Sequence, residues 1–225
     1  MYEGVTMNFY NDSNDKELKT ETFVRNLVIS SVNFIPEVGG ILSLFLDKYL
    51  PDVLQKRQNQ FLNDLAMDLE MLPDEIIKNL IVSEEYHSLL LKTFSSILQE
   101  NNIERINCFR NILINAAIDE NSDYNEIDFY YKLLNELVSD QIRILHLFYL
   151  RDFKKTLSFI DIYDYVQENW KNFDKAYCAV LIPEIMRYGL ITNSRESKRE
   201  FGNGYHLTMF GKRFINFIFS PIELC

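Results

Sequence analysis

Long runs without glycine or proline constrain this chain more than any other feature of its sequence. Only seven glycines and five prolines occur in 225 residues. The runs between them repeat apolar residues at the three- and four-residue spacing of an amphipathic helix. Because 47% of the residues are hydrophobic, the chain can also bury a sizeable core. The sequence therefore predicts an all-α, mostly helical protein with short connections.

The apolar spacing and the capping residues predict helices along most of the chain. Two short extended segments, residues 190–192 and 204–208, interrupt this pattern and are separated by a polar, charged stretch. The predicted helices span residues 20–35, 36–49, 51–72, 73–81, 83–100, 103–118, 127–137, 139–150, 158–168, 173–189 and 208–219.

The segment from residue 139 onward has the outline of a winged helix, because three closely spaced helices precede a two-stranded hairpin with a charged tip. Gly189 is expected to end the third helix in the left-handed conformation. Gly202 and Gly204 are expected to permit positive φ in the hairpin. We therefore predict an N-terminal helical bundle followed by a C-terminal winged-helix domain with a small β-hairpin.

The polar segment 119–126 is the expected linker between the two parts. This division gives a flexible N-terminus at 1–19, a helical bundle at 20–126 and a winged-helix-like domain at 127–225. Charge divides the chain in a similar way: residues 1–138 hold 11 basic and 23 acidic side chains, net −12, and residues 139–225 hold 12 and 10, net +2. The two parts should therefore differ in their electrostatic behaviour.

The most apolar stretch, residues 27–46, is about 30 Å long if helical, which is just enough to span a bilayer. Pro36 breaks it, however, and Glu37 offsets much of the insertion energy. Three interpretations remain: a buried helical hairpin of a soluble bundle, a hairpin released on activation to insert as an oligomer, and a permanent oligomerisation face. The candidate membrane or oligomerisation residues are Pro36, Glu37, Gly39, Gly40, Ile41, Leu42, Ser43 and Phe45.

Four segments in the second half resemble bacterial abortive infection alpha proteins. They are FRNILINAAID at 109–119, LLNELVSDQIRIL at 133–145, MRYGLI at 186–191 and YHLTMFGKRF at 205–214, and the similarity covers about residues 105–219. The resemblance implies a helical part paired with a winged-helix-like part, and a role in phage defence by self-limitation of the infected cell. It supplies no catalytic residue.

Neither enzymatic motifs nor metal-ligand spacings occur in the sequence. The histidines His87, His146 and His206 are far apart, and no HExxH, GxGxxG, GxxxxGK or GxSxG is present. The three cysteines lack CxxC spacing and are odd in number, which favours a reducing cytoplasm. We therefore expect a cytoplasmic protein that is not an enzyme and binds no cofactor or metal. The polar residues after Met1 also lead us to expect no secretory signal.

The third helix of the expected winged helix has no basic face, although DNA-binding members of this class normally need one. Lys175 and Arg187 are offset there by Asp174 and Glu184. A partner is therefore more plausibly a protein than nucleic acid. The candidate residues for nucleic-acid or partner contact are Lys175, Arg187, Arg195, Lys198, Arg199, Lys212 and Arg213.

These features together predict an anti-phage defence protein that recognises a phage or host protein trigger and acts by self-association. Membrane association on activation is part of this hypothesis. The alternatives are a winged-helix DNA-binding regulator and a non-membrane adaptor or antitoxin-like interaction protein.

Overall fold

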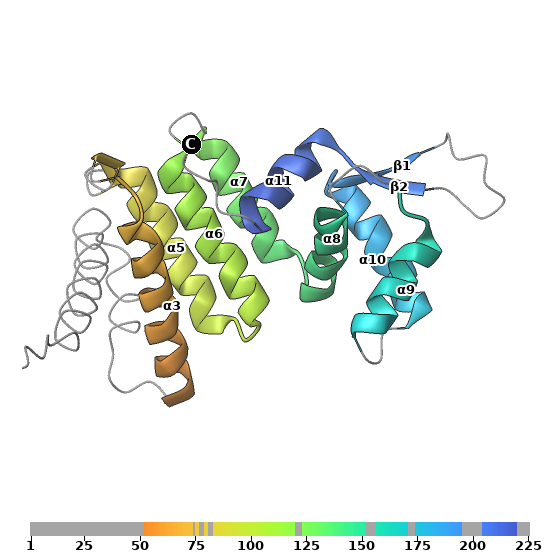
Figure 1. Cartoon of the computed structure of the whole chain (residues 1–225), viewed down its shortest axis with the longest axis horizontal. Helices are drawn as coiled ribbons and strands as arrows, with labels where there is room; N and C mark the ends of the chain where they lie inside the picture. Colours follow the sequence, from red (N-terminus) through yellow and green to blue (C-terminus); the bar gives the residue numbers. More distant parts are fainter. Residues whose placement is uncertain are drawn as a thin grey trace, which may run out of the picture. The chain divides into compact units, whose positions relative to one another are not determined.

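The computed structural model describes residues 52–73, 75–76, 79–80, 83–119, 123–151, 156–170, 174–194 and 204–219. This part of the chain is mostly helical and contains one small antiparallel sheet, as predicted (Figure 1). Its elements are α3 (Asp52–Glu70), α5 (Glu84–Gln99), α6 (Ile103–Ile118), α7 (Tyr124–Glu136), α8 (Ser139–Leu150), α9 (Phe159–Asn169), α10 (Lys175–Arg187), β1 (Ile191–Ser194), β2 (Gly204–Leu207) and α11 (Met209–Phe219).

The chain divides into two compact units, Met1–Glu100 and Asn101–Cys225. This division precedes the polar segment 119–126, at which the sequence placed its linker. The reason is that α6 packs against α7 and α11, so its contacts lie with the second unit. The apolar segment 27–46 and the eight membrane or oligomerisation candidates within it lie outside the described residues.

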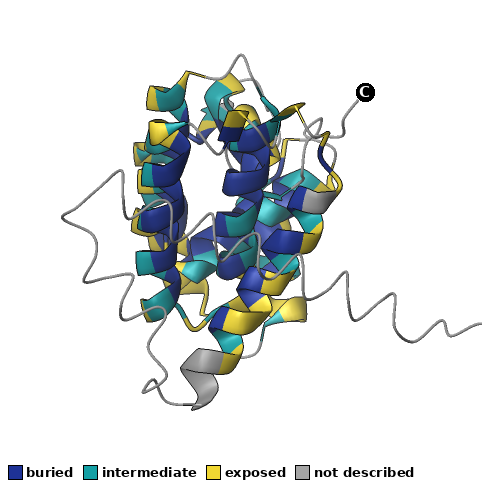
Figure 2. Cartoon of the chain, turned by 90° about the vertical axis from the view of Figure 1, so that its left-hand side faces the viewer, coloured by how far each residue is buried: buried dark blue, intermediate teal, exposed yellow. Residues whose placement is uncertain are grey.

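In the first unit, α3 and α5 pack through apolar side chains. Phe61 and Phe94 meet edge to face with ring centroids 5.8 Å apart, and Leu65 and Leu90 are fully buried. Ser83 caps α5 by accepting a hydrogen bond from the backbone N–H of Tyr86 at 3.1 Å. Burial follows one side of the helical ribbons, and exposed residues follow the other (Figure 2). This is the amphipathic pattern from which these helices were predicted.

In the second unit, α11 packs against both α6 and α8. Tyr130 of α7 contributes to this core through ring contacts with Phe210, Phe214 and Phe217 of α11. Helix α8 also contacts α9 and α10, so it connects the α6–α7–α11 group to the helices that precede the hairpin. Helix α11, the last of the described helices, therefore packs into the same core as α6, α7 and α8.

The hairpin pairs β1 with β2 in the register Ile191 to Leu207 and Ser194 to Gly204. A further bridge precedes α9, where Leu157 and Tyr205 exchange backbone hydrogen bonds of 2.9 and 2.7 Å. The residues between the two strands, 195–203, lie outside the described residues. The element order of this region is therefore helix, bridge, two helices, hairpin and helix.

Glycine occurs at positions 189 and 204 of this region for different structural reasons. Gly189 has φ of 72°, as expected of a residue that ends a helix in the left-handed conformation. Gly204 was expected to permit positive φ, but Gly189 is the only positive-φ glycine among the described residues. Instead, a Cβ at Gly204 would overlap the side chain of Thr156. The requirement for glycine there is close packing rather than backbone conformation.

Helix α7 begins at Tyr124, earlier than the residue 127 expected from sequence. Asp123 caps it, because its carboxylate accepts a hydrogen bond from the backbone N–H of Asn125 at 2.9 Å. The acidic residue that suggested a polar linker is thus a helix cap.

Within the described ranges, no helix combines the length and apolar character needed to cross a membrane.

Candidate partner-binding surface and cavity

Four of the predicted contact residues lie in the described part of the second unit, and three of them contact neighbouring side chains. Arg187 pairs with Glu184 at 2.6 Å, and Arg213 pairs with Glu126 at 3.0 Å. The ammonium of Lys175 lies 6.0 and 5.9 Å from the ring centroids of Phe159 and Tyr163. Lys212 is on α11, where it is partly exposed. The other three candidates, Arg195, Lys198 and Arg199, lie outside the described residues.

The structure does not bring Lys175 and Arg187 together on α10. They stand at its two ends, twelve residues apart, which corresponds to about 18 Å at the rise of an α-helix. Arg187 is also neutralised locally by Glu184, and its guanidinium lies 5.3 Å from the ring centroid of Tyr188. Helix α10 therefore presents two separate cations rather than a basic face.

Between these ends, the exposed side of α10 is apolar. Val180 is 60% exposed and Tyr177 is 41% exposed, and Ala176, Ala179 and Pro183 are exposed beside them. The opposite side is buried and holds Cys178, Leu181, Ile182 and Ile185. We call Ala176, Ala179, Val180 and Pro183 the α10 apolar face. Their spacing of three or four residues places them on one stripe of the helix.

Pro183 adds a polar feature to the α10 apolar face. Because proline has no backbone N–H, it cannot make the helical hydrogen bond to the carbonyl of Ala179. Ala179 is itself exposed, next to Val180. A partner could therefore combine apolar contact with a hydrogen bond to the backbone.

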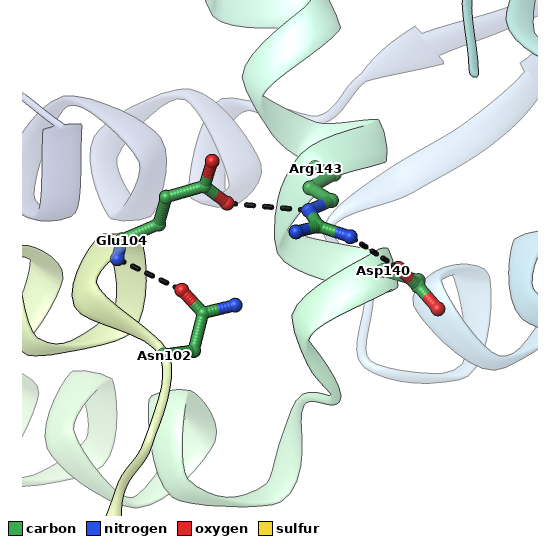
Figure 3. Close-up of polar contacts among 4 residues, drawn as sticks. All are labelled: Asn102, Glu104, Asp140 and Arg143. Carbon is green, nitrogen blue, oxygen red and sulfur yellow. Dashed lines mark hydrogen bonds and ion pairs between the residues drawn. The ribbon is translucent and has the colours of Figure 1, made fainter. Parts of the chain in front are cut away.

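A polar network links α6, α8 and α10 of the second unit, and Figure 3 shows its contacts between α6 and α8. Arg143 of α8 pairs through Nε with Glu104 of α6 at 3.2 Å and through Nη1 with Asp140 at 3.0 Å. Asp140 in turn forms a hydrogen bond with Tyr177 of α10. Asn102 caps α6 by accepting the backbone N–H of Glu104 at 2.8 Å, which fixes the first turn that carries this carboxylate.

Burial raises the pKa of Tyr177, and the neighbouring Asp140 carboxylate raises it further. Tyr177 therefore stays protonated at neutral pH and can donate a hydrogen bond to Asp140. This contact fixes one edge of α10 to α8, next to the α10 apolar face.

A cavity of about 200 Å³ lies on the α6 and α8 side of this network. Arg143 lies over the indole of Trp170, 5.1 Å from its centroid, and both residues line the cavity. The lining residues are Glu104, Asn107, Cys108, Asn111, Ile142, Arg143, His146, Trp170, Ile218 and Phe219. The cavity therefore combines ring and aliphatic walls with several polar groups.

His146 is the one histidine among the lining residues. Burial lowers its pKa, and the nearby Glu104 carboxylate raises it by a smaller amount. At neutral pH the imidazole is therefore uncharged, with one nitrogen as donor and the other as acceptor.

The lowered pKa of His146 predicts a pH-dependent stability. The unfolded chain takes up a proton near the ordinary histidine value of about 6.5, whereas the folded protein does so only at lower pH. The contribution is therefore fully present above that value and is lost as the pH falls through the folded pKa. Urea unfolding at pH 7.5 and 5.5 should show a smaller loss of stability in His146→Gln than in the wild type. Equal losses would contradict this assignment.

The described residues include no group of three or more histidine, cysteine, aspartate and glutamate side chains that could hold a metal ion. Burial raises the pKa of Cys108 to about 12 and that of Cys178 to about 11. These two thiols are therefore protonated at neutral pH and are poor nucleophiles.

Sequence reasoning missed both the α10 apolar face and the cavity. One signal for the cavity was present: Trp170 is the only tryptophan of the chain, and Arg143 interrupts the apolar run QIRILHLFYL. An arginine flanked by two buried isoleucines needs polar partners, and Glu104 and Asp140 supply them. Comparisons with protein-family models, curated proteins and solved structures find no match to this chain.

Proposed function

We propose that this chain is a non-catalytic anti-phage defence protein, whose second unit is a winged-helix domain that binds a protein trigger through α10. Binding would lead to self-association through the apolar segment 27–46, with membrane disruption as the outcome. The observation that carries the proposal is the α10 apolar face, since it occupies the surface that a DNA-reading helix would need to be basic.

Electrostatics around α10 support a protein partner over nucleic acid. Helix α9 has no basic residue and exposes Asp161, Asp164 and Glu168. With Asp174 and Glu184, residues 159–187 hold five acidic side chains against three basic ones, Lys171, Lys175 and Arg187. A phosphate backbone would be repelled by this balance, whereas an apolar helix face with a polar border is typical of protein interfaces.

The element order supports the winged-helix interpretation. Through the Leu157–Tyr205 bridge, a third backbone segment pairs with the β1–β2 hairpin. This segment lies between α8 and α9, the first and second helices of the expected domain. The third helix, α10, then leads directly into β1 through Gly189. Winged helices bind either nucleic acid or protein, so the charge and polarity of the α10 surface indicate which kind of partner binds.

The defence role rests on the resemblance to abortive infection alpha proteins. Its four segments lie on α6, on α7 and α8, at the junction of α10 with β1, and on β2 with α11. Several of their residues have structural roles. Asn115 donates a hydrogen bond to α11, and Gly189 ends α10. Thr208 caps α11 by accepting the backbone N–H of Gly211 at 2.8 Å. The resemblance therefore supports a common fold through residues with structural roles.

Phage plating on a sensitive bacterial host that expresses the chain tests this function. Wild-type protein should lower plaque numbers, and Val180→Glu should restore them, because a charge on the α10 apolar face opposes docking of an apolar partner. Gln167→Glu is the matched control, since it makes the same charge change at an exposed position of α9. Ile41→Asp should also restore plaques if segment 27–46 is the effector.

Three results would count against the proposal. Unreduced plaque numbers with well-expressed wild-type protein would refute the defence role. Protection that persists in Val180→Glu would refute the assigned partner surface. A DNA mobility shift that disappears in the Arg195→Ala, Lys198→Ala and Arg199→Ala triple variant would favour the DNA-binding regulator instead.

A further inference from the structure

The cavity of the second unit has the size of a small ring compound. Its volume is about 200 Å³, while an apolar protein cavity of roughly 150 Å³ can hold benzene. Residues of α6, α8 and α11 line it together with Trp170, the residue that ends α9. A compound with one or two fused rings therefore fits, and a drug-sized ligand does not.

The walls of the cavity favour a planar occupant. Trp170, Phe219 and His146 contribute rings, and Ile142 and Ile218 contribute aliphatic surface. The rings of His146 and Phe219 lie 4.8 Å apart between centroids at an angle of 50°, so they form a corner rather than a closed stack. Aromatic rings pack favourably against planar groups in offset or tilted arrangements.

Two polar side chains of the lining, both partly exposed, are available to bind an occupant. Asn111 donates its amide to the carbonyl of Ile218 at 2.8 Å. Within the described part of the chain, however, neither Asn107 nor the imidazole of His146 makes a hydrogen bond. Each of these two groups can both donate and accept. An occupant whose edge carries both donors and acceptors would satisfy them.

The charges of the lining disfavour an anionic occupant. Arg143 is the cation of the cavity wall, and it already pairs with Glu104 and Asp140. In the lining itself Glu104 balances Arg143, while Asp140, which pairs with Arg143 from outside the lining, makes the local charge balance negative. His146 is uncharged at neutral pH. A phosphate group would therefore meet repulsion rather than a binding site.

We propose that this cavity binds an uncharged planar heteroaromatic molecule of nucleobase size, held between Trp170, His146 and Phe219 and hydrogen-bonded by Asn107 and His146. This ligand site is separate from the α10 apolar face and does not depend on the defence role. The chemical class includes free purine and pyrimidine bases and the base of a nucleoside.

The single tryptophan makes the site directly measurable, since Trp170 is the only one in the chain. Titration of the 225-residue chain with adenine should change its fluorescence saturably, and saturation-transfer NMR should detect the same binding. Adenosine should bind comparably and adenosine monophosphate more weakly. Benzene should bind more weakly than adenine, because it leaves Asn107 and His146 unsatisfied.

A matched pair of variants tests the hydrogen bond. Asn107→Ala should weaken adenine binding about tenfold, the loss expected for one hydrogen bond. Asn135→Ala should leave it unchanged, because Asn135 is exposed on α7 and donates to Tyr131 of its own helix.

Four outcomes would overturn the proposal. The first is the absence of saturable binding of adenine, guanine, cytosine and uracil up to their solubility limits. The second is benzene binding as tightly as adenine, and the third is the monophosphate binding as tightly as adenosine. These comparisons use the wild-type chain and do not depend on a variant folding. The fourth is an unchanged affinity in an Asn107→Ala protein with native circular dichroism.

Discussion

Asn115→Asp is expected to lower the free energy of unfolding by about 3–5 kcal/mol at neutral pH, the range for an uncompensated buried charge. The side chain of Asn115 is fully buried on α6 and donates its amide to the carbonyl of Phe217 in α11 at 2.8 Å. That carbonyl belongs to the last turn of α11, where the helix itself supplies no donor. Aspartate has nearly the same shape but turns an oxygen toward this acceptor.

The pH dependence of the same variant separates a lost donor from a general packing defect. Burial and the facing carbonyl should raise the pKa of the introduced carboxyl above its ordinary value of about 4. The folded variant then holds a proton that the unfolded chain releases, so its stability relative to the wild type should increase as the pH falls. Urea unfolding of both proteins between pH 8 and 5 measures this change.

Asn169→Asp is the matched control for Asn115→Asp. Asn169 makes the same type of bond, from its amide to the carbonyl of Tyr165 at 2.8 Å, but it is exposed at the end of α9. Its replacement should cost within about 1 kcal/mol, because water can solvate the new carboxylate. Equal losses in the two variants would contradict the role assigned to Asn115 in holding α11.

The helices could be predicted because each one has a local signal. The apolar spacing of α5 and α6 and the capping serine at position 83 are properties of short segments. Gly189 likewise marks the end of α10 through its own backbone freedom, and the hairpin follows from two extended segments around a polar stretch. Local chemistry was therefore sufficient for the elements that the structure describes, within a few residues at their ends.

Features made by residues far apart in sequence could not be predicted in this way. The Leu157–Tyr205 bridge involves one residue of each segment and has no periodic pattern. Asp123 lies in the polar segment that was expected to be a linker. Only the position of α7 shows that it caps a helix. Gly204 packs closely against Thr156, which is 48 residues earlier in the chain.

The candidate sites divide in the same way. The absence of a basic face on α10 could be predicted, since it depends on the composition of one helix. The α10 apolar face could not, because exposure of Val180 depends on which side of α10 contacts α8 and β1. The cavity is assembled from four separate elements, and its polar balance depends on the pairing of Arg143 with Glu104, 39 residues away.

Gly211→Ala is expected to destabilise the second unit by about 3 kcal/mol, at the upper end of the range for an overpacked core. Gly211 is buried in the first turn of α11, and a Cβ there would overlap the backbone carbonyl of Leu190. That carbonyl also accepts the backbone N–H of Thr208 at 3.0 Å, and Thr208 caps α11. Moving Leu190 aside would therefore disturb the start of β1 and the cap of α11 together.

Gly204→Ala provides the contrast that identifies the cause. Its Cβ would also meet an atom at overlapping distance, but that atom is the side-chain methyl of Thr156, an exposed residue that can rotate. The expected loss is about 1 kcal/mol, because a side chain gives way more easily than a backbone carbonyl. Thermal unfolding of the two alanine variants should therefore show a clearly larger decrease in Tm for Gly211→Ala. Similar decreases would mean that α11 can shift away from Leu190 at little cost, and the close approach of α11 to the start of β1 would then not be a fixed feature of the fold.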